Sequence, residues 1–187
     1  MATATTVERF GLSPLIRFTL LSLYLALVLP LPLLAHAALR GWMAAGLLLG
    51  LLLVVGLLSE RVETDSEGIR VLYPIWIRWL FRRGWCMAWN DIRALVPVGT
   101  SQGGTVYYLK AANRKNQLLP QRIERFEQFL TLLQERSAVN TRGIGRLTPP
   151  WTYQLLAVLA MLMVVGEMLA TLAVNQEWIS LPAGFPG

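Results

Sequence analysis

Two long apolar stretches dominate the hydrophobic pattern of this chain. Residues 18–58 are almost continuously apolar, interrupted only by His36, Arg40 and a few small or proline residues, and residues 151–174 form a second apolar run. A helix of about 20 apolar residues covers the roughly 30 Å hydrocarbon core of a bilayer, so the first run is long enough for two passes. The pattern therefore predicts three membrane-spanning helices.

Local signals give the bounds of these helices. Ser13-Pro14 predicts an N-cap and a first-turn proline, and Pro30 and Pro32 should kink or loosen the far end of the first helix. A short turn is expected over residues 35–41, made by Arg40-Gly41-Trp42, after which the chain returns across the membrane. We expect a tail over 1–13, a transmembrane helical hairpin over 14–58, a third transmembrane helix over 151–174 and a tail over 175–187.

The region between the second and third helices has a different pattern. Residues 59–137 alternate apolar and polar positions and contain turn residues, which predicts a water-facing domain, and residues 138–150 form a polar linker. The expected strands cover 69–73, 85–92, 94–98, 105–111 and 117–119, followed by a helix over 121–137. An apolar stripe at three- and four-residue spacing predicts that this helix packs on the sheet; its members are Ile123, Phe126, Phe129, Leu130 and Leu133.

Strands in hairpin order closed by one amphipathic helix resemble the bacterial PH-like domains of small membrane proteins. The stretches that carry this resemblance are Glu67-Gly68-Ile69-Arg70-Val71, Trp89-Asn90-Asp91-Ile92, Val106-Tyr107-Tyr108-Leu109 and Leu118-Leu119-Pro120. The resemblance implies an α+β membrane protein in which a PH-like β-barrel or sheet with a C-terminal helix is inserted between transmembrane helices 2 and 3. The layout also resembles the photosystem I assembly factor family, and the chain is similar to uncharacterised thylakoid proteins of cyanobacteria. These similarities imply a photosynthetic complex as the client.

Charge is distributed unevenly and sets the expected orientation. Of the seventeen Lys and Arg residues, fourteen lie between Arg61 and Arg146, and the formal net charge is +6. By the positive-inside rule, the central domain and the N-terminus face the cytoplasm or the equivalent side of an internal membrane. We expect a multi-pass protein of the thylakoid or plasma membrane. A cleaved signal peptide ending near Ala35-His36-Ala37 is the alternative, but the first run is long for a signal peptide and starts well into the chain.

Aromatic and basic residues interleave in one segment close to the second helix. Its members are Trp76, Arg78, Trp79, Arg82, Arg83 and Trp85. Tryptophan favours the headgroup level and arginine is attracted to anionic lipid, so the segment could rest on the bilayer. The same residue types are enriched in protein interfaces. The simpler alternative is that two of the tryptophans face the core while the arginines are solvated. We discount nucleic acid because the lipid surface is a nearer polyanion.

Glu167 is an acidic residue well inside the third helix. A carboxylate there is costly unless it is paired or protonated, so intramembrane acids are functional candidates by default. Glu167 could contact a neighbouring helix, an arginine of a partner subunit, a pigment or an ion. The alternative is that the helix ends near Gly166 and Glu167 lies at the membrane interface.

Catalytic and metal-binding patterns are missing from the sequence. The chain has a single cysteine, Cys86, and a single histidine, His36, and we find no nucleophile elbow, phosphate-binding glycine loop or paired metal-ligand motif. We therefore expect no enzyme activity, no metal and no cofactor, although a lipid or pigment could bind between the helices.

The favoured hypothesis is a non-enzymatic assembly or stability factor that binds subunits of a membrane protein complex. A lipid-binding or membrane-organising module that uses the tryptophan and arginine segment is the first alternative. A small transporter or channel subunit, with Glu167 lining a pathway, is the second.

Overall fold

The computed structural model describes residues 7–79, 84–101, 103–112 and 116–176. The chain divides into two compact units. The first, here called the sheet unit, comprises residues 1–14 and 56–149, and the second, the helical unit, comprises residues 15–55 and 150–187.

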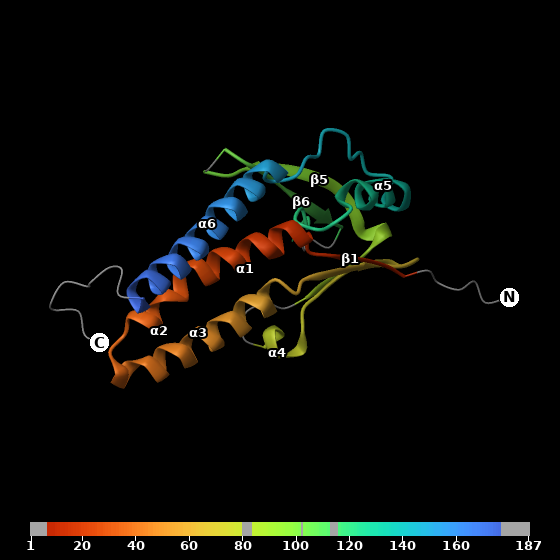
Figure 1. The fold of residues 1–187 in the computed structure, drawn as a ribbon. Coiled ribbons are helices and arrows are strands. Elements are labelled where there is room, and N and C mark those ends of the chain that lie inside the picture. The colour runs from red at the N-terminus through yellow and green to blue at the C-terminus, as the bar shows by residue number, and fades with distance from the viewer. Residues whose placement is uncertain (1–6, 80–83, 102, 113–115, 177–187) are drawn as a thin grey trace. The chain divides into compact units, whose positions relative to one another are not determined.

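Long apolar helices make up the helical unit (Figure 1). They are α1 (Pro14–Val28), α2 (Pro30–Leu34), α3 (Ala37–Leu57) and α6 (Pro150–Asn175). Three segments are long and apolar enough to cross a membrane, namely Pro14–Leu34, Ala37–Leu57 and Pro150–Ala173. The three predicted apolar helices are therefore present.

The connection between the first two spans lies within the turn predicted over residues 35–41, but Arg40, Gly41 and Trp42 belong to α3. The chain instead breaks at Ala35, whose backbone is extended, and the amides of Leu39 and Arg40 donate to the carbonyl of His36 to begin α3. Glycine and tryptophan are tolerated inside an apolar helix, so this turn signal was too weak to end it. The predicted kink near the far end of the first helix lies at Pro30, which has no amide hydrogen and separates α1 from α2.

Small residues and two hydrogen bonds join the helices of this unit. The hydroxyl of Thr19 on α1 donates to the carbonyl of Tyr153 on α6 at 3.0 Å. Ala26 on α1 and Ala160 on α6 are both buried. The hydroxyl of Tyr24 donates to the carbonyl of Leu47 on α3 at 2.7 Å. Close approach of this kind is typical of membrane helices, where small residues let backbones meet.

The sheet unit contains two antiparallel sheets. One has the order β1 (Glu8–Gly11), β2 (Arg61–Thr64), β3 (Gly68–Leu72), β4 (Trp85–Ala88). The other has the order β5 (Ile92–Gly99), β6 (Thr105–Ala111), β7 (Gln117–Leu118). The helices of the unit are α4 (Ile75–Arg78), the 3-10 turn η1 (Trp89–Asp91) and α5 (Phe126–Ser137).

The N-terminal segment is not simply the tail expected over residues 1–13. Glu8–Gly11 form the edge strand β1, which pairs with β2 in the register Phe10 to Val62. Only Phe10 of this strand is buried, so four residues with one apolar position carry almost no strand signal. The partner strand lies some fifty positions later in the chain, and such long-range pairing cannot be read from a local pattern.

Helix α5 packs on the sheets as its apolar stripe predicted. Phe126, Phe129, Leu130 and Leu133 are all buried. The helix begins at Phe126 rather than at residue 121, because Arg125 has a φ of 48° and interrupts the helical backbone. The two sheets and the terminal helix give the sheet unit its α+β class.

A tight hairpin and the indole of Trp89 hold β2 and β3 together. The Asp65 carboxylate accepts the amides of Glu67 and Gly68 at 2.8 and 2.9 Å. The Trp89 indole donates to the Asp65 carbonyl at 2.9 Å, and its own amide donates to the Glu67 carbonyl. The Trp89 segment quoted for the PH-like resemblance therefore has a structural role in this hairpin.

Candidate functional site

Helix α4 presents an exposed aromatic surface. Ile77 is fully buried, whereas Ile75 is 81% exposed, Trp79 is 79% exposed and Trp76 is 39% exposed. This short helix therefore buries Ile77 and leaves the neighbouring apolar side chains exposed. Trp79 is therefore not one of the two tryptophans that the simpler alternative places in the core.

The last turn of α3 lies against α4 within the sheet unit. A Cβ atom added to Gly56 would come within 2.2 Å of the Trp76 ring and 2.4 Å of the Ile77 side chain. Glycine is thus what allows this close approach. Chain continuity then places α4 next to the end of a helix long enough to span a bilayer.

A groove of about 770 Å³ opens beside α4. Its wall contains Arg70 from β3, Arg78 from α4 and the ring of Trp85 from β4, and the exposed Trp79 and Ile75 also line it. The structure thus brings Arg78, Trp79 and Trp85 together at one groove. Arg82 and Arg83, the other two arginines of the predicted segment, lie outside the described residues.

Arg70 and Ile75 are groove residues that the sequence analysis did not single out. In β3, Ile69 and Val71 are buried and Arg70 between them is exposed. This alternation places Arg70 on the exposed face of the sheet, and it is the sequence signal from which that position could have been predicted. Nothing local predicted that α4 would form and bring Ile75 to the same groove.

Acidic groups already balance one of the two arginines. The Arg70 guanidinium lies 3.1 Å from the Asp65 carboxylate and 3.7 Å from that of Glu67. The amides of Gly68 and Glu67, with a smaller contribution from Arg70, hold the pKa of Asp65 below its ordinary value of 3.8. Arg78 forms no ion pair with any residue that the structure describes.

Glu167 lies on the packed face of α6. Tyr153, Ala157, Ala160 and Val164 precede it at three- and four-residue intervals and are buried or half-buried. The bond from Thr19 to Tyr153 directs this face toward α1. Helix α6 continues to Asn175, so the alternative of a helix ending near Gly166 is wrong.

One carboxylate oxygen of Glu167 has no partner. Its Oε2 atom is buried and accepts no hydrogen bond within the described part of the chain. A buried polar atom without a hydrogen bond is costly, and it is therefore a candidate for an external contact.

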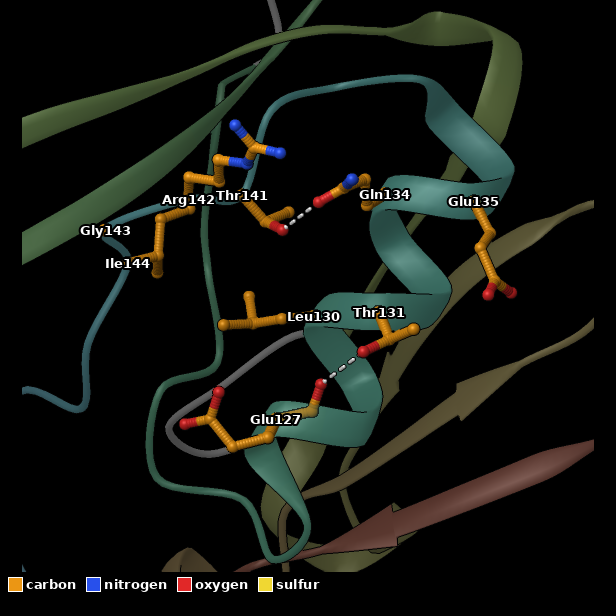
Figure 2. Close-up of a pocket in the computed structure, with 9 residues that line it drawn as sticks. All are labelled: Glu127, Leu130, Thr131, Gln134, Glu135, Thr141, Arg142, Gly143 and Ile144. Carbon is orange, nitrogen blue, oxygen red and sulfur yellow. Dashed lines mark hydrogen bonds between the residues drawn. The ribbon is translucent and has the colours of Figure 1, made fainter.

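Figure 2 shows a second cavity, of about 600 Å³, between α5 and residues 141–144. The hydroxyl of Thr141 donates to Gln134 at 2.7 Å across it. Exposed Glu127, Glu135 and Arg142 stand around its rim. The segment predicted to be a polar linker is therefore fixed to the sheet unit at Thr141, which is buried.

The remaining candidate residues lie apart from both features. His36 is exposed at the break before α3. Cys86 is the exception, because its exposed free thiol on β4 lies among the residues that line the groove beside α4. Within the described residues, no group of three or more His, Cys, Asp or Glu is arranged to hold a metal ion.

Comparison with known proteins gives one informative match. No protein-family model matches the chain, and no solved structure matches it. The chain is 38% identical over 179 residues to "Uncharacterized protein slr0269" of Synechocystis sp.. The alignment covers 92% of this chain and 88% of that protein. The chain belongs to the slr0269 family. The expected similarity to cyanobacterial proteins is confirmed at this level, whereas the PH-like arrangement stays a prediction.

Proposed function

We propose that this member of the slr0269 family is a non-enzymatic integral membrane protein that binds subunits of a membrane protein complex and acts as an assembly or stability factor. The three long apolar helices support membrane insertion. The small sheet unit supports a binding role, since folds of this kind position surfaces rather than define a reaction.

The pairing of β1 with β2 supports the proposed orientation. Strand β1 precedes α1 and pairs with β2, which follows α3, so both ends of the helical hairpin return to the same side. The concentration of basic residues between Arg61 and Arg146 assigns that side to the cytoplasm or its equivalent. The end of α6 then faces the opposite compartment.

The unpaired oxygen of Glu167 is the observation that carries the binding proposal. A carboxylate inside a membrane helix normally pairs with another group, and the described residues of this chain supply no donor to its Oε2 atom. A donor from a helix of a client subunit completes the pair.

A photosynthetic complex of the thylakoid is the client we propose. The relative in Synechocystis supports a cyanobacterial setting for the family. An assembly factor needs no catalytic group, and its affinity can reside in helix packing and one intramembrane polar contact.

Isolation of the intact chain tests this function. The protein is tagged at its N-terminus in a cyanobacterial host, extracted in mild detergent and separated on a native gel, and co-migrating proteins are identified by mass spectrometry. The proposal expects stoichiometric subunits of a membrane complex, with photosystem subunits among them. Recovery of the chain alone, under conditions that keep known complexes intact, would overturn it.

A further inference from the structure

The exposed surface of α4 lies at the level where a bilayer would end. Helix α3 has 21 residues, which at 1.5 Å per residue is about the thickness of the hydrocarbon core. Gly56 in its last turn contacts Trp76 and Ile77. An α3 that spans a bilayer would therefore hold α4 at the headgroup region.

The side chains at this level suit a lipid interface. Ile75 and Trp79 stand one helical turn apart and are 81% and 79% exposed. Exposure of such apolar side chains to water is unfavourable, whereas an indole at the headgroup level is favourable. Adjacent apolar side chains of this kind usually mark an interaction surface.

The groove beside these side chains carries unbalanced positive charge. Arg70 is paired with Asp65 and Glu67, but Arg78 pairs with no residue that the structure describes. Arg78 lines the groove together with exposed apolar side chains and the half-buried Trp85. A guanidinium in such a setting matches an anionic group that is joined to an apolar tail.

We propose that this groove binds the headgroup of an anionic lipid from the cytoplasmic leaflet. Arg78 contacts the phosphate, and the acyl chains pass Ile75 and Trp79 on their way into the bilayer. The site is separate from Glu167, so its occupancy does not depend on the proposed client.

Lipid retention by the full chain tests the site. The protein is reconstituted in nanodiscs of phosphatidylcholine with 30% phosphatidylglycerol, released into detergent and examined by native mass spectrometry for bound phosphatidylglycerol. Arg78→Gln should reduce retention of phosphatidylglycerol about fivefold, because it removes one arginine near the membrane surface. Trp79→Ala should also reduce it, while Arg136→Gln, which removes an exposed arginine from α5, should match the unchanged protein.

Three outcomes would overturn the proposal. Equal retention in Arg78→Gln, Trp79→Ala and Arg136→Gln would show that the groove does not hold the lipid. Displacement of phosphatidylglycerol by 20 mM inorganic phosphate at constant ionic strength would indicate a site for a soluble anion. Loss of a protein partner in Trp79→Ala, with lipid retention unchanged, would identify the groove as a protein interface.

Salt provides a measurement that requires no variant. An arginine at the membrane surface is screened as ionic strength rises, so retention by the unchanged protein should fall between 0.15 and 1 M NaCl. Retention that is independent of salt would contradict a headgroup contact through Arg78.

Discussion

The ring of Phe10 meets the ring of Phe129 edge to face, with centroids 5.6 Å apart and planes at 73°. The contact joins the N-terminal strand β1 to helix α5 near the end of the sheet unit. The Arg125 guanidinium lies over the Phe10 ring, 5.1 Å from its centroid. A segment that precedes the first long apolar helix is therefore part of the core of a domain that follows the second.

Phe10→Ala should destabilise the sheet unit severely. Phe10 is fully buried, and removal of such a ring typically costs about 3–5 kcal/mol of unfolding free energy. Urea unfolding of the detergent-solubilised chain, followed by near-UV circular dichroism, measures the change. Val7→Ala, at an exposed position, should alter it by less than about 0.5 kcal/mol. A cost below about 1 kcal/mol for Phe10→Ala would contradict the packing of β1 described here.

Gly68→Ala should be much more harmful than Gly99→Ala. A Cβ atom at Gly68 would lie 2.2 Å from the Met87 carbonyl oxygen, so β3 and β4 would have to separate. We expect a loss of about 2–3 kcal/mol. At Gly99 a Cβ atom meets nothing within 4 Å, and the substitution should be close to neutral. Similar unfolding curves for the two variants would refute this account of the strand contact.

Asp65 should make the sheet unit sensitive to acid. Its pKa is lowered in the fold, so its carboxylate contributes stability above its ordinary pKa of 3.8. That contribution is lost as pH falls through the lower folded value. Unfolding measured from pH 6 to pH 2 should therefore show a smaller acid-dependent loss in Asp65→Asn than in the unchanged protein. Superimposable pH profiles, after allowance for their offset at pH 6, would contradict this.

Tyr24 and Gly50 should act together in the helical unit. A Cβ atom at Gly50 would fall 2.3 Å from the Tyr24 hydroxyl oxygen, which bonds to Leu47. Gly50→Ala should therefore displace the hydroxyl, and Tyr24→Phe should remove a bond of about 0.6 kcal/mol. Thermal melting in detergent should show that Gly50→Ala costs less in the Tyr24→Phe background than alone. Gly46→Ala, which meets no neighbour, is the matched control. Fully additive effects would argue against the contact.

Local pattern was sufficient for the elements whose signal is strong. The apolar runs predicted the long helices to within a few residues, apart from the start of α3, and the alternation in residues 105–111 predicted β6 with its observed bounds. Burial of Phe126, Phe129, Leu130 and Leu133 followed from helical spacing. In each case the signal is local, because it lies within the residues of the element itself.

Elements that depend on distant partners were not predictable. Strand β1 exists because β2 and α5 cover Phe10, and α4 forms where Ile77 can be buried beside Gly56. Trp79 and Arg78 were candidates from their composition, but the groove that joins them to Arg70 depends on the pairing of β3 with β4. Glu167 was evident as a charge in an apolar run, whereas the face on which it lies required the contact between α1 and α6.

The most direct test of the client-binding proposal compares Glu167 variants in the native-gel isolation. Glu167→Leu removes the acceptor and should abolish co-migration of the client. Gln154→Leu, which removes an exposed polar side chain near the start of α6, should leave it intact. Glu167→Gln separates two kinds of donor, since loss of the client would indicate a cationic partner and retention a neutral one. Full recovery of the client with Glu167→Leu would contradict the claim that this carboxylate completes a contact with another membrane subunit.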